Sequence, residues 1–215
     1  MDRLRGLIAI PAYNEEITLP IVLESLKKHK DLDVLVVNDG STDGTEQALK
    51  NFTVLKIKHA KNKGYSNTLN TAFEYANNAL YDFICYFDAD GEHKSEDLDK
   101  FKFEVNEHCL AKVGVRSSFN RIGERFAAKY GAARFGIRDP YCGLKSYNLR
   151  QLRNMSFNSW PGCKIGTGLV REIVKYYGDS SVQNVSISVA KRKDFSRFSA
   201  NFLSANFNLI KNILT

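Results

Sequence analysis

The feature that most constrains the fold is a regular alternation of strand-like and helix-like segments along the first 90 residues. Runs of apolar and β-branched residues predict four strands, over residues 4–13, 33–39, 52–58 and 81–90. Helical spacing of apolar side chains, together with capping residues, predicts helices over residues 15–29, 40–51 and 64–79. This alternation is typical of right-handed βαβ units, so we expect an α/β fold with a mostly parallel central sheet flanked by helices.

The second half of the chain has a looser pattern. We expect short strands over 111–118 and 181–193, helices over 121–136 and 162–178, and a turn followed by an extended segment over 139–149. In the last segment, 195–215, Phe198, Phe202, Ala205 and Leu209 follow helical spacing. We therefore divide the chain into one domain, 1–198, and a C-terminal amphipathic helix, 199–215. Such a helix suits a membrane interface, a dimer partner or the domain itself.

Composition places the chain among ordinary globular proteins. Its 215 residues suit a single domain, and its four cysteines show no CxxC or CxH spacing, so we expect reduced thiols and no zinc site. The first residues, "MDRLRGLIAIPAYNEE", do not resemble a signal peptide, and no run reaches the roughly 18 apolar residues of a membrane-spanning helix. We expect a cytoplasmic protein, with peripheral contact to the cytosolic face of the membrane if its substrate is a lipid.

Charge is distributed unevenly along the chain. Residues 1–111 carry 13 Lys and Arg against 19 Asp and Glu, whereas residues 112–153 carry 10 against 2. An acidic first half and a basic second half indicate two different kinds of ligand. We do not expect a nucleic acid to be one of them, because the acidic loops would repel its phosphates unless a metal intervened.

Polar side chains gather at three predicted strand ends, in the sequences "PAYNEE", "VNDGSTDG" and "DADGEH". Ligands on parallel sheets bind at the carboxyl ends of the strands. In the third sequence, Asp88 and Asp90 can turn toward one ion and Glu92 can join them, which favours Mg²⁺ or Mn²⁺ bridging to phosphates. A solvated acidic loop has the same pattern, so the acids alone are weak evidence.

The other strand ends and one helix start carry residues suited to a nucleotide. Asp39 can accept hydrogen bonds from a ribose or a base. Tyr13 can stack on a base, and Glu15 can bind ribose hydroxyls. The sequence "NKG", which contains Lys63 and Gly64, precedes a predicted helix, where an anionic group is favoured. Together these signals are far more specific than any one of them.

In this order, "IPAYNEE", "VVNDGSTDGT", "NKGYSNTL", "FDADGEH" and "DPYCGLKSYN" resemble the family-two inverting glycosyltransferases, and within them the polyprenyl-phosphate (dolichyl-phosphate mannose synthase-like) sugar transferases. The resemblance spans residues 6–198 and is stronger over the first 95. It implies a GT-A type, Rossmann-like α/β fold, a nucleotide-diphosphate-sugar donor and a divalent metal, Mg²⁺ or Mn²⁺. No GxGxxG follows the first strand, which disfavours a dinucleotide-binding dehydrogenase.

The resemblance also implies roles for individual residues. The nucleotide-sugar site would comprise Pro11, Ala12, Tyr13, Glu15, Asp39, Lys63, Gly64, Asp88 and Ala89. The metal would be held by Asp88, Asp90 and Glu92, although the family often has Gln where Glu92 stands, and a solvent-facing Glu92 is the alternative. The catalytic candidates are Asp90, Asp139, Arg116 and Arg125.

Arginines of the second half are implied to bind the acceptor. In the polyprenyl-phosphate subgroup, arginines after a GxR motif bind the acceptor phosphate, and Arg116 and Arg125 match best. Arg192 and Arg197 match a later basic motif, with Asp194 where Gly is common. Arginine suits phosphate because its guanidinium makes paired, charge-assisted hydrogen bonds. Solvated basic surfaces are the alternative, and the stretch between Arg116 and Arg125 is shorter than in the subgroup.

Three functions remain open from the sequence. The first is metal-dependent sugar transfer to a polyprenyl phosphate for cell-envelope glycans, in which the acceptor phosphate has a second pKa of about 6 and needs no protein base. The second is transfer to a sugar hydroxyl of a lipid-linked or polysaccharide glycan, which needs a base, and Asp139 is the candidate. With a phosphate acceptor, Asp139 instead orients neighbouring arginines or caps a turn. The third is a non-catalytic nucleotide-sugar-binding protein, which the intact Asp39, Asp88 and Asp90 argue against.

Overall fold

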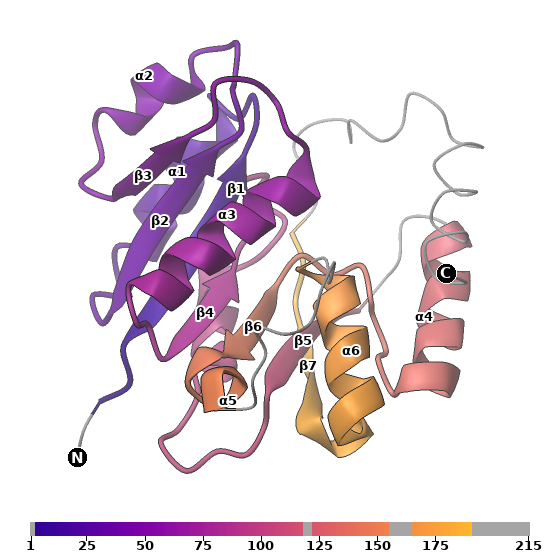
Figure 1. The fold of residues 1–215 in the computed structure, drawn as a ribbon. Helices are drawn as coiled ribbons and strands as arrows, with labels where there is room; N and C mark the ends of the chain where they lie inside the picture. Colours follow the sequence, from indigo (N-terminus) through magenta and orange to yellow (C-terminus); the bar gives the residue numbers. More distant parts are fainter. Residues whose placement is uncertain (1–2, 118–121, 155–164, 191–215) are drawn as a thin grey trace.

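The computed structural model describes residues 3–117, 122–154 and 165–190. A seven-stranded sheet forms its centre, with the strand order β3-β2-β1-β4-β6-β5-β7 (Figure 1). The strands are β1 (Gly6–Ala12), β2 (Leu32–Asn38), β3 (Leu55–Lys58), β4 (Phe83–Tyr86), β5 (Ala111–Arg116), β6 (Lys145–Asn148) and β7 (Val182–Ile187). The helices are α1 (Thr18–Leu26), α2 (Thr45–Leu49), α3 (Tyr65–Asn78), α4 (Ile122–Phe135), α5 (Leu149–Asn154) and α6 (Thr167–Tyr177), with the 3-10 helices η1 (Ser95–Phe101) and η3 (Asp179–Ser181).

The sheet is mostly parallel, as the alternation predicts. β1 lies between β2 and β4 and runs parallel to both, while β3 runs parallel to β2 and β7 to β5. β6 is the exception among the described strands, because it pairs antiparallel with both β4 and β5. The carboxyl ends of β1, β2, β4 and β5 therefore lie at one edge of the sheet. β6 begins at that same edge, with Lys145 opposite Tyr86.

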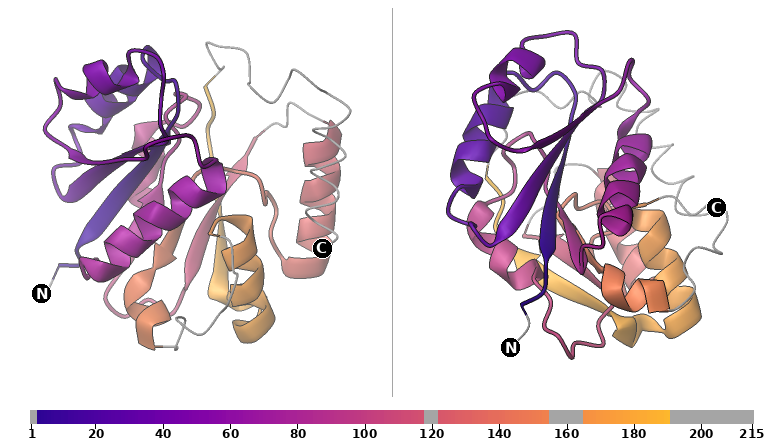
Figure 2. Two further views of the ribbon diagram at one scale, coloured as in Figure 1. Left: turned by 45° about the horizontal axis from the view of Figure 1, so that its top comes forward. Right: turned by 60° about the vertical axis from the view of Figure 1, so that its left-hand side comes forward.

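Alternate residues of β1 enter two separate cores, because neighbouring side chains of a strand point to opposite faces. Leu7 and Ala9 pack in the core that contains residues of α3 and α6, whereas Ile8 and Ile10 pack with residues of α1 and η1. The right-hand view of Figure 2 shows α1 and α3 on opposite sides of β1. The sheet is thus covered on both faces, which explains why its central strands are continuous apolar runs.

Element boundaries differ from the sequence predictions where segments are short or polar. α1 and α2 are shorter than predicted. Of the turn and extended segment predicted over 139–149, only the four residues of β6 form a strand. Three elements are absent from the predictions: the three-residue η3, η1 with the largely polar sequence "SEDLDKF", and α5, which follows β6 directly. Leu98 and Phe101 anchor η1 in the core, and Leu149 and Leu152 anchor α5. Two apolar residues per element are too few to establish a helical period.

The C-terminal segment lies outside the described residues, which end at Ala190. The division into a domain, 1–198, and a helix, 199–215, therefore stays a prediction. Within the part of the chain that the structure describes, no helix is both long and apolar enough to cross a membrane.

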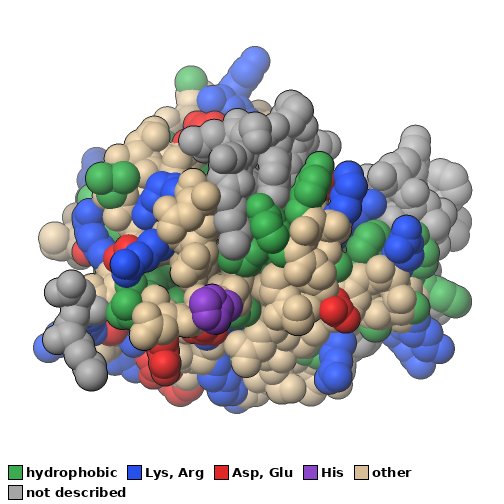
Figure 3. Space-filling view, turned by 60° about the horizontal axis from the view of Figure 1, so that its bottom comes forward, with side chains coloured by type: hydrophobic (Ala, Val, Ile, Leu, Met, Phe, Trp, Pro, Cys, Tyr) green, Lys and Arg blue, Asp and Glu red, His purple; other side chains and the backbone are tan. Residues whose placement is uncertain are grey.

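Surface charge is mixed on the face shown in Figure 3. Lys and Arg side chains are scattered over this face, with acidic side chains between them. Part of the basic excess of residues 112–153 is inside the protein, because Lys112, Arg116 and Lys145 are only 7%, 9% and 5% exposed. The sequence charge of this segment therefore overstates the charge that its surface presents.

Gly6 at the start of β1 is a sensitive packing position. A Cβ at this residue would lie 2.2 Å from Cζ of Phe83 and 2.6 Å from Cδ2 of Leu32. We expect Gly6→Ala to lower the free energy of unfolding by about 1–3 kcal/mol, because the buried Phe83 ring has to move. Chemical denaturation followed by circular dichroism measures this loss.

Phe83→Leu provides the matched background for this test, since it removes the ring that clashes with the added methyl group. Gly6→Ala should destabilise the Phe83→Leu protein less than the wild type, because residues in contact do not act additively. Equal losses in the two backgrounds would contradict the packing explanation.

Candidate active site

The first two strand-end loops are joined by hydrogen bonds. The backbone N–H of Asn14 donates to Oγ of Ser41 over 2.9 Å, and the backbone N–H of Thr42 donates to Oδ1 of Asn14 over 2.8 Å. The backbone N–H of Glu15 donates to Oγ1 of Thr45 over 2.8 Å. Asn14 reaches its partners with a left-handed φ of 54°, which asparagine tolerates better than most residues. The loops after β1 and β2 therefore form one unit.

The predicted nucleotide-site residues of the first loop belong to this unit. Pro11 and Ala12 end β1; Ala12 is buried, whereas Pro11, Tyr13 and Glu15 are partly exposed. The Glu15 carboxylate accepts a hydrogen bond from the hydroxyl of Thr18 in the first turn of α1. Tyr13 and Glu15 thus stand at the carboxyl end of β1, and their contact with a nucleotide stays a prediction.

Asp39 follows β2 and is only 3% exposed. Its Oδ1 accepts hydrogen bonds from Nδ1 of His59 over 2.6 Å and from the backbone N–H of Lys63 over 2.9 Å. Its Oδ2 accepts from the backbone N–H of Gly64 over 2.8 Å. Burial by itself would raise the pKa of Asp39, but these three hydrogen bonds outweigh it and lower the pKa below its ordinary value. The carboxylate is therefore ionised at neutral pH.

The hydrogen bonds of Asp39 hold the loop that leads into α3. Three of the roughly four acceptor positions of a carboxylate are used by this loop, so among the described residues one acceptor position, on Oδ2, remains. Gly40 permits the loop that leads into α3 to pass close to the backbone after Asp39. Its φ is +68°, and a Cβ there would lie 2.6 Å from the carbonyl carbon of Lys61. Lys63 and Gly64 enter the site through their backbone N–H groups, and their predicted contact with the donor is not tested by this arrangement.

Sequence reasoning missed His59, which shares the Asp39 carboxylate with the loop. It directly follows β3 and is 5% exposed. One signal could have found it: it directly follows the predicted strand 52–58, just as Asp39 stands at the end of the predicted strand 33–39. A lone histidine at a strand end is weak evidence, so its role depends on the contacts described above.

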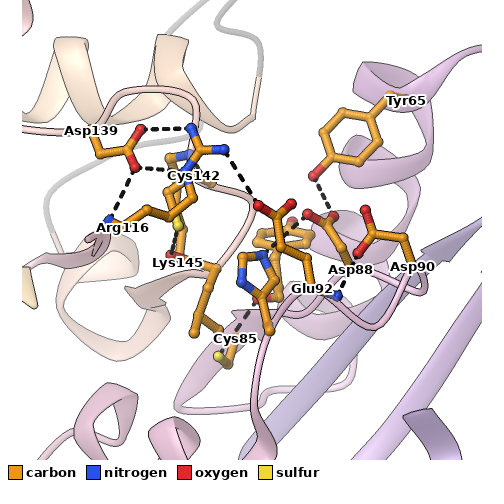
Figure 4. A network of polar contacts seen from close by, with 12 residues as sticks. Tyr65, Cys85, Asp88, Asp90, Glu92, Arg116, Asp139, Cys142 and Lys145 are labelled. Atoms are coloured by element: carbon orange, nitrogen blue, oxygen red, sulfur yellow. Dashed lines mark hydrogen bonds and ion pairs between the residues drawn. The ribbon is translucent and has the colours of Figure 1, made fainter. Parts of the chain in front are cut away.

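Asp88 is held in place from several sides. Its Oδ1 accepts a hydrogen bond from the Tyr65 hydroxyl over 3.0 Å, and its Oδ2 lies 3.3 Å from Nε2 of His93 (Figure 4). A Cβ at Gly143 would lie 1.7 Å from Oδ2, so the segment before β6 passes directly against this carboxylate. The following Ala89 is 3% exposed. The roles of Tyr65, His93 and Gly143 are not apparent from the sequence.

The structure brings together two of the three predicted metal ligands, Asp88 and Asp90, in one loop, whereas the Glu92 carboxylate lies elsewhere. Asp90 lies in the loop of Asp88, and its Oδ1 accepts the backbone N–H of Glu92 over 3.0 Å. The Glu92 carboxylate lies beside Arg116, with Oε1 3.8 Å from Nη1 (Figure 4). Among the described residues, no three His, Cys, Asp or Glu side chains form a metal-binding group. The alternative of a solvent-facing Glu92 is wrong, because this residue is 6% exposed.

The buried guanidinium of Arg116 organises the other half of the site. Nε and Nη2 donate to the two oxygens of Asp139 over 2.8 and 3.1 Å, and the Arg116 backbone N–H donates to Asp139 Oδ2 over 3.2 Å. Nη2 also lies 3.7 Å from Oε2 of Glu124. Burial by itself would lower the pKa of Arg116, but Asp139 and Glu124 raise it above its ordinary value, so the guanidinium stays charged.

The ion pair between Arg116 and Asp139 restricts the roles predicted for these two residues. Asp139 is 1% exposed, and both of its oxygens accept hydrogen bonds from Arg116, which fits the orienting role better than that of a base. An acceptor phosphate at Arg116 would have to join or displace these carboxylate contacts. The roles of Arg116 and Asp139 in catalysis stay predictions.

Lys145 is a second buried basic residue, at the start of β6. Its Nζ donates to the carbonyl of Cys142. Burial lowers the pKa of Lys145, whereas the charges of Asp139 and Asp88 oppose that effect. The Lys145 amine therefore lies near both acidic groups. In the sequence it is only one residue of the basic segment 112–153, because nothing there reveals its burial.

Among the described residues, no contact joins Arg125 to Arg116. It is exposed on α4, next to Glu124, whose carboxylate faces the Arg116 guanidinium. Its predicted role in binding the acceptor phosphate therefore rests on the sequence.

Arg192 and Arg197 lie outside the described residues. The chain that leads to them passes the acidic loop, because the backbone N–H of Ala190 donates to the carbonyl of Glu92 over 2.9 Å. An antiparallel bridge between His93 and the residue before Ala190 reinforces this contact. The described part of the chain therefore ends, at Ala190, beside the acidic loop.

The sequence is similar to those of known proteins. The sequence model of glycosyl transferase family 2 matches residues 7–177. An uncharacterized protein of Methanocaldococcus jannaschii is 27% identical over 218 residues, covering 85% of this chain and 95% of that protein. The UDP-N-acetylglucosamine–dolichyl-phosphate N-acetylglucosaminyltransferase of Methanococcus voltae is 34% identical over 116 residues, 46% of each protein. The polyprenol monophosphomannose synthase of Mycolicibacterium smegmatis is 30% identical over 119 residues, 52% of this chain and 45% of that protein.

Solved structures confirm the fold. Glucosyl-3-phosphoglycerate synthase from Mycobacterium tuberculosis is similar with a TM-score of 0.79 at 17% sequence identity, over 98% of this chain and 79% of that one. The predicted GT-A type α/β fold is therefore confirmed. The match spans less than half the length of the Methanococcus voltae and Mycolicibacterium smegmatis relatives. The family match covers most of the sheet and the loops at its carboxyl edge, and on this evidence the chain belongs to glycosyl transferase family 2.

Proposed function

We propose that the protein is an inverting, metal-dependent glycosyltransferase that moves a sugar from a nucleotide diphosphate to a polyprenyl phosphate. Family membership supports the transfer of a sugar. The acceptor class is supported by the names of relatives from Methanococcus voltae, Mycolicibacterium smegmatis and Micrococcus luteus, which refer to dolichyl phosphate, polyprenol and undecaprenyl phosphate. The observation that carries the proposal is that Asp39, Asp88 and Arg116 come from the carboxyl ends of three strands at one edge of the sheet.

The donor would bind at the loops after β1, β2 and β4. Structures of the Mycobacterium tuberculosis synthase contain UDP and Mn²⁺, and they share the fold of this chain at 16% identity. In this chain, Tyr13 and Glu15 would face the base and ribose, and the free acceptor position of Asp39 would face a donor group of the nucleotide. The acids of the loop after β4 would then lie at the diphosphate.

The carboxylates present fit a divalent metal. Mg²⁺ is commonly bound through one or two carboxylates together with substrate phosphates, rather than by a complete protein cage. Asp88 and Asp90 would supply these oxygens, while Glu92 stays beside Arg116. A bound Mg²⁺ or Mn²⁺ would neutralise the charge of the departing nucleoside diphosphate. Tyr65 would keep Asp88 in place through its hydrogen bond to Oδ1.

The acceptor would approach from the side of Arg116. A phosphate acceptor is already an anion at neutral pH and needs no base, whereas a hydroxyl acceptor does. The pairing of Asp139 with Arg116 leaves this carboxylate poorly placed as a base, which supports the phosphate acceptor. Arg116 provides buried positive charge on this side, and the segment with Arg192 would add more.

Release of nucleoside diphosphate tests the proposed reaction. Purified protein is incubated with Mn²⁺ or Mg²⁺ and a panel of UDP- and GDP-sugars, in the presence of undecaprenyl phosphate, of a glycan acceptor, or of neither. We expect release that requires both the lipid phosphate and the metal. Release only with a glycan acceptor would replace this function by transfer to a hydroxyl and would make Asp139 the base. No release with any donor and acceptor would contradict an enzymatic function.

Asp90→Asn removes one carboxylate charge and keeps the shape of the side chain. We expect turnover to fall by about 10²–10³-fold, the usual effect of removing one group that stabilises transition-state charge. The dependence of the rate on Mn²⁺ concentration should move to higher concentrations. Rates over a Mn²⁺ titration and the thermal unfolding midpoint measure the two effects.

Glu74→Gln is the control for Asp90→Asn, because Glu74 is an exposed carboxylate on α3. It should leave the rate, its metal dependence and the stability unchanged. Undiminished metal-dependent turnover in Asp90→Asn would remove Asp90 from the metal site.

Arg116→Lys keeps a positive charge but loses the paired hydrogen bonds to Asp139. We expect the KM for the lipid phosphate to rise about tenfold, with a small change in the KM for the donor. Initial rates with each substrate varied separately measure the two values. Arg116→Ala leaves Asp139 buried without its partner, so it should instead lower the free energy of unfolding by about 3–5 kcal/mol.

Arg138→Lys is the control for Arg116→Lys, since Arg138 is exposed and adjoins Asp139 in sequence. It should change neither KM. Equal increases in the two KM values of Arg116→Lys would show that Arg116 supports the structure and does not act on the acceptor.

A further inference from the structure

His59 is a buried histidine that joins three elements of the donor half. Its backbone N–H donates to the carbonyl of Asn38 at the end of β2 over 2.9 Å. Its Nδ1 lies 2.6 Å from Oδ1 of Asp39, and its Nε2 lies 2.9 Å from Oγ1 of Thr71 on α3. One residue thus links the ends of β2 and β3 to α3.

The partners of His59 hold its ring from both sides. Asp39 is ionised and can only accept hydrogen bonds, so Nδ1 of His59 must donate. On the other side of the ring, Oγ1 of Thr71 lies within hydrogen-bond distance of Nε2 and, over 3.0 Å, of the carbonyl of Asn67 one helical turn back. Both ring nitrogens therefore have a polar partner, and the orientation of the ring is fixed.

The hydrogen bond from His59 also matters for the charge of Asp39. Asp39 is the carboxylate that contacts the ring, and the adjoining Lys58 pairs with Glu46 of α2 at 3.6 Å. A buried carboxylate is costly unless cations or hydrogen-bond donors compensate its charge. The ring compensates Asp39 together with two backbone N–H groups of the 59–64 loop.

We propose that His59 is a positioning residue of the donor site, whose Nδ1 hydrogen bond fixes the Asp39 carboxylate and the 59–64 loop in the orientation required by a nucleotide. The part that concerns the nucleotide rests on the proposed function. The ordering of the loop does not depend on it. His59 acts through Asp39, since the carboxylate lies between the ring and the remaining acceptor position.

Two substitutions separate the contributions of the two nitrogens. His59→Asn places an amide near the position of Nδ1 and retains a donor for Asp39. His59→Gln reaches toward Thr71 and loses the donor for Asp39. Backbone amide hydrogen exchange of Lys63 and Gly64, measured by NMR on the full chain, reports the order of the loop.

We expect exchange of these two amides to be about tenfold faster in His59→Gln and nearly unchanged in His59→Asn, which corresponds to one lost hydrogen bond to a charged group. His29→Gln is the control, because His29 is also buried, at 6% exposure, and contacts the Ser95 carbonyl away from Asp39. It should leave both amides unaffected. Equal acceleration in the Asn and Gln variants of His59, or none in either, would overturn the positioning role.

Ring nitrogen spectra test the hydrogen bond from His59 to Asp39 directly. In protein labelled with ¹⁵N-histidine, the His59 signals are those that His59→Asn lacks. We expect Nδ1 to carry a proton in the wild type, because it donates to Asp39. An unprotonated Nδ1 would overturn the positioning role.

Nucleotide titrations separate this inference from the proposed function. We would titrate UDP and GDP, each with Mn²⁺, into the wild type and the two His59 variants by calorimetry. We expect about tenfold weaker binding for His59→Gln and a smaller change for His59→Asn. Equal binding by all three proteins would overturn the role of His59 at the donor. If the wild type binds neither nucleotide, the proposed function fails, and the exchange and ring measurements still decide whether His59 orders the loop.

Discussion

The arrangement of the site depends on the buried ion pair between Arg116 and Asp139. Two charges inside a protein are stable only when they are paired and their remaining hydrogen bonds are satisfied. Here three hydrogen bonds join the two residues, and Glu92 and Glu124 lie near the same guanidinium. These partners come from the loop after β4, from α4 and from the segment before β6. The pair therefore sets the relative positions of segments that are far apart in sequence, and the geometry of this half of the site cannot be separated from its folding.

The fold of the first 90 residues is predictable because burial there follows a simple period. Leu7 and Ile8 point to opposite faces of β1, and both faces are covered, so the strand appears as an apolar run. β6 cannot be predicted in this way, since Lys145 and Ser146 are polar and yet only 5% and 0% exposed. Their burial follows from pairing with β4, a strand about 60 residues earlier, which no local pattern records.

The sequence locates the strand ends of the site, but it does not reveal which side chains meet there. Glu92 has the spacing of a third metal ligand, and its carboxylate lies with Arg116 instead. Arg116 has the pattern of a cation available to a phosphate, and it is buried against Asp139. Asp39 has the sequence position of a nucleotide-binding residue, yet most of the acceptor positions of its carboxylate accept hydrogen bonds from the 59–64 loop. A sequence shows where charges occur along the chain, whereas the structure shows which charges compensate each other.

The reversed direction of β6 has a consequence for how the two halves of the site meet. An antiparallel strand begins where its neighbours end, so the turn that precedes β6 lies at the carboxyl edge of β4 and β5. This turn carries Asp139 to Arg116 and Gly143 to Asp88. A parallel strand of the same four residues would start at the opposite edge, about 13 Å away, and would carry the turn with it. One strand reversal thus allows a single short connection to touch the acidic loop and the buried arginine at once.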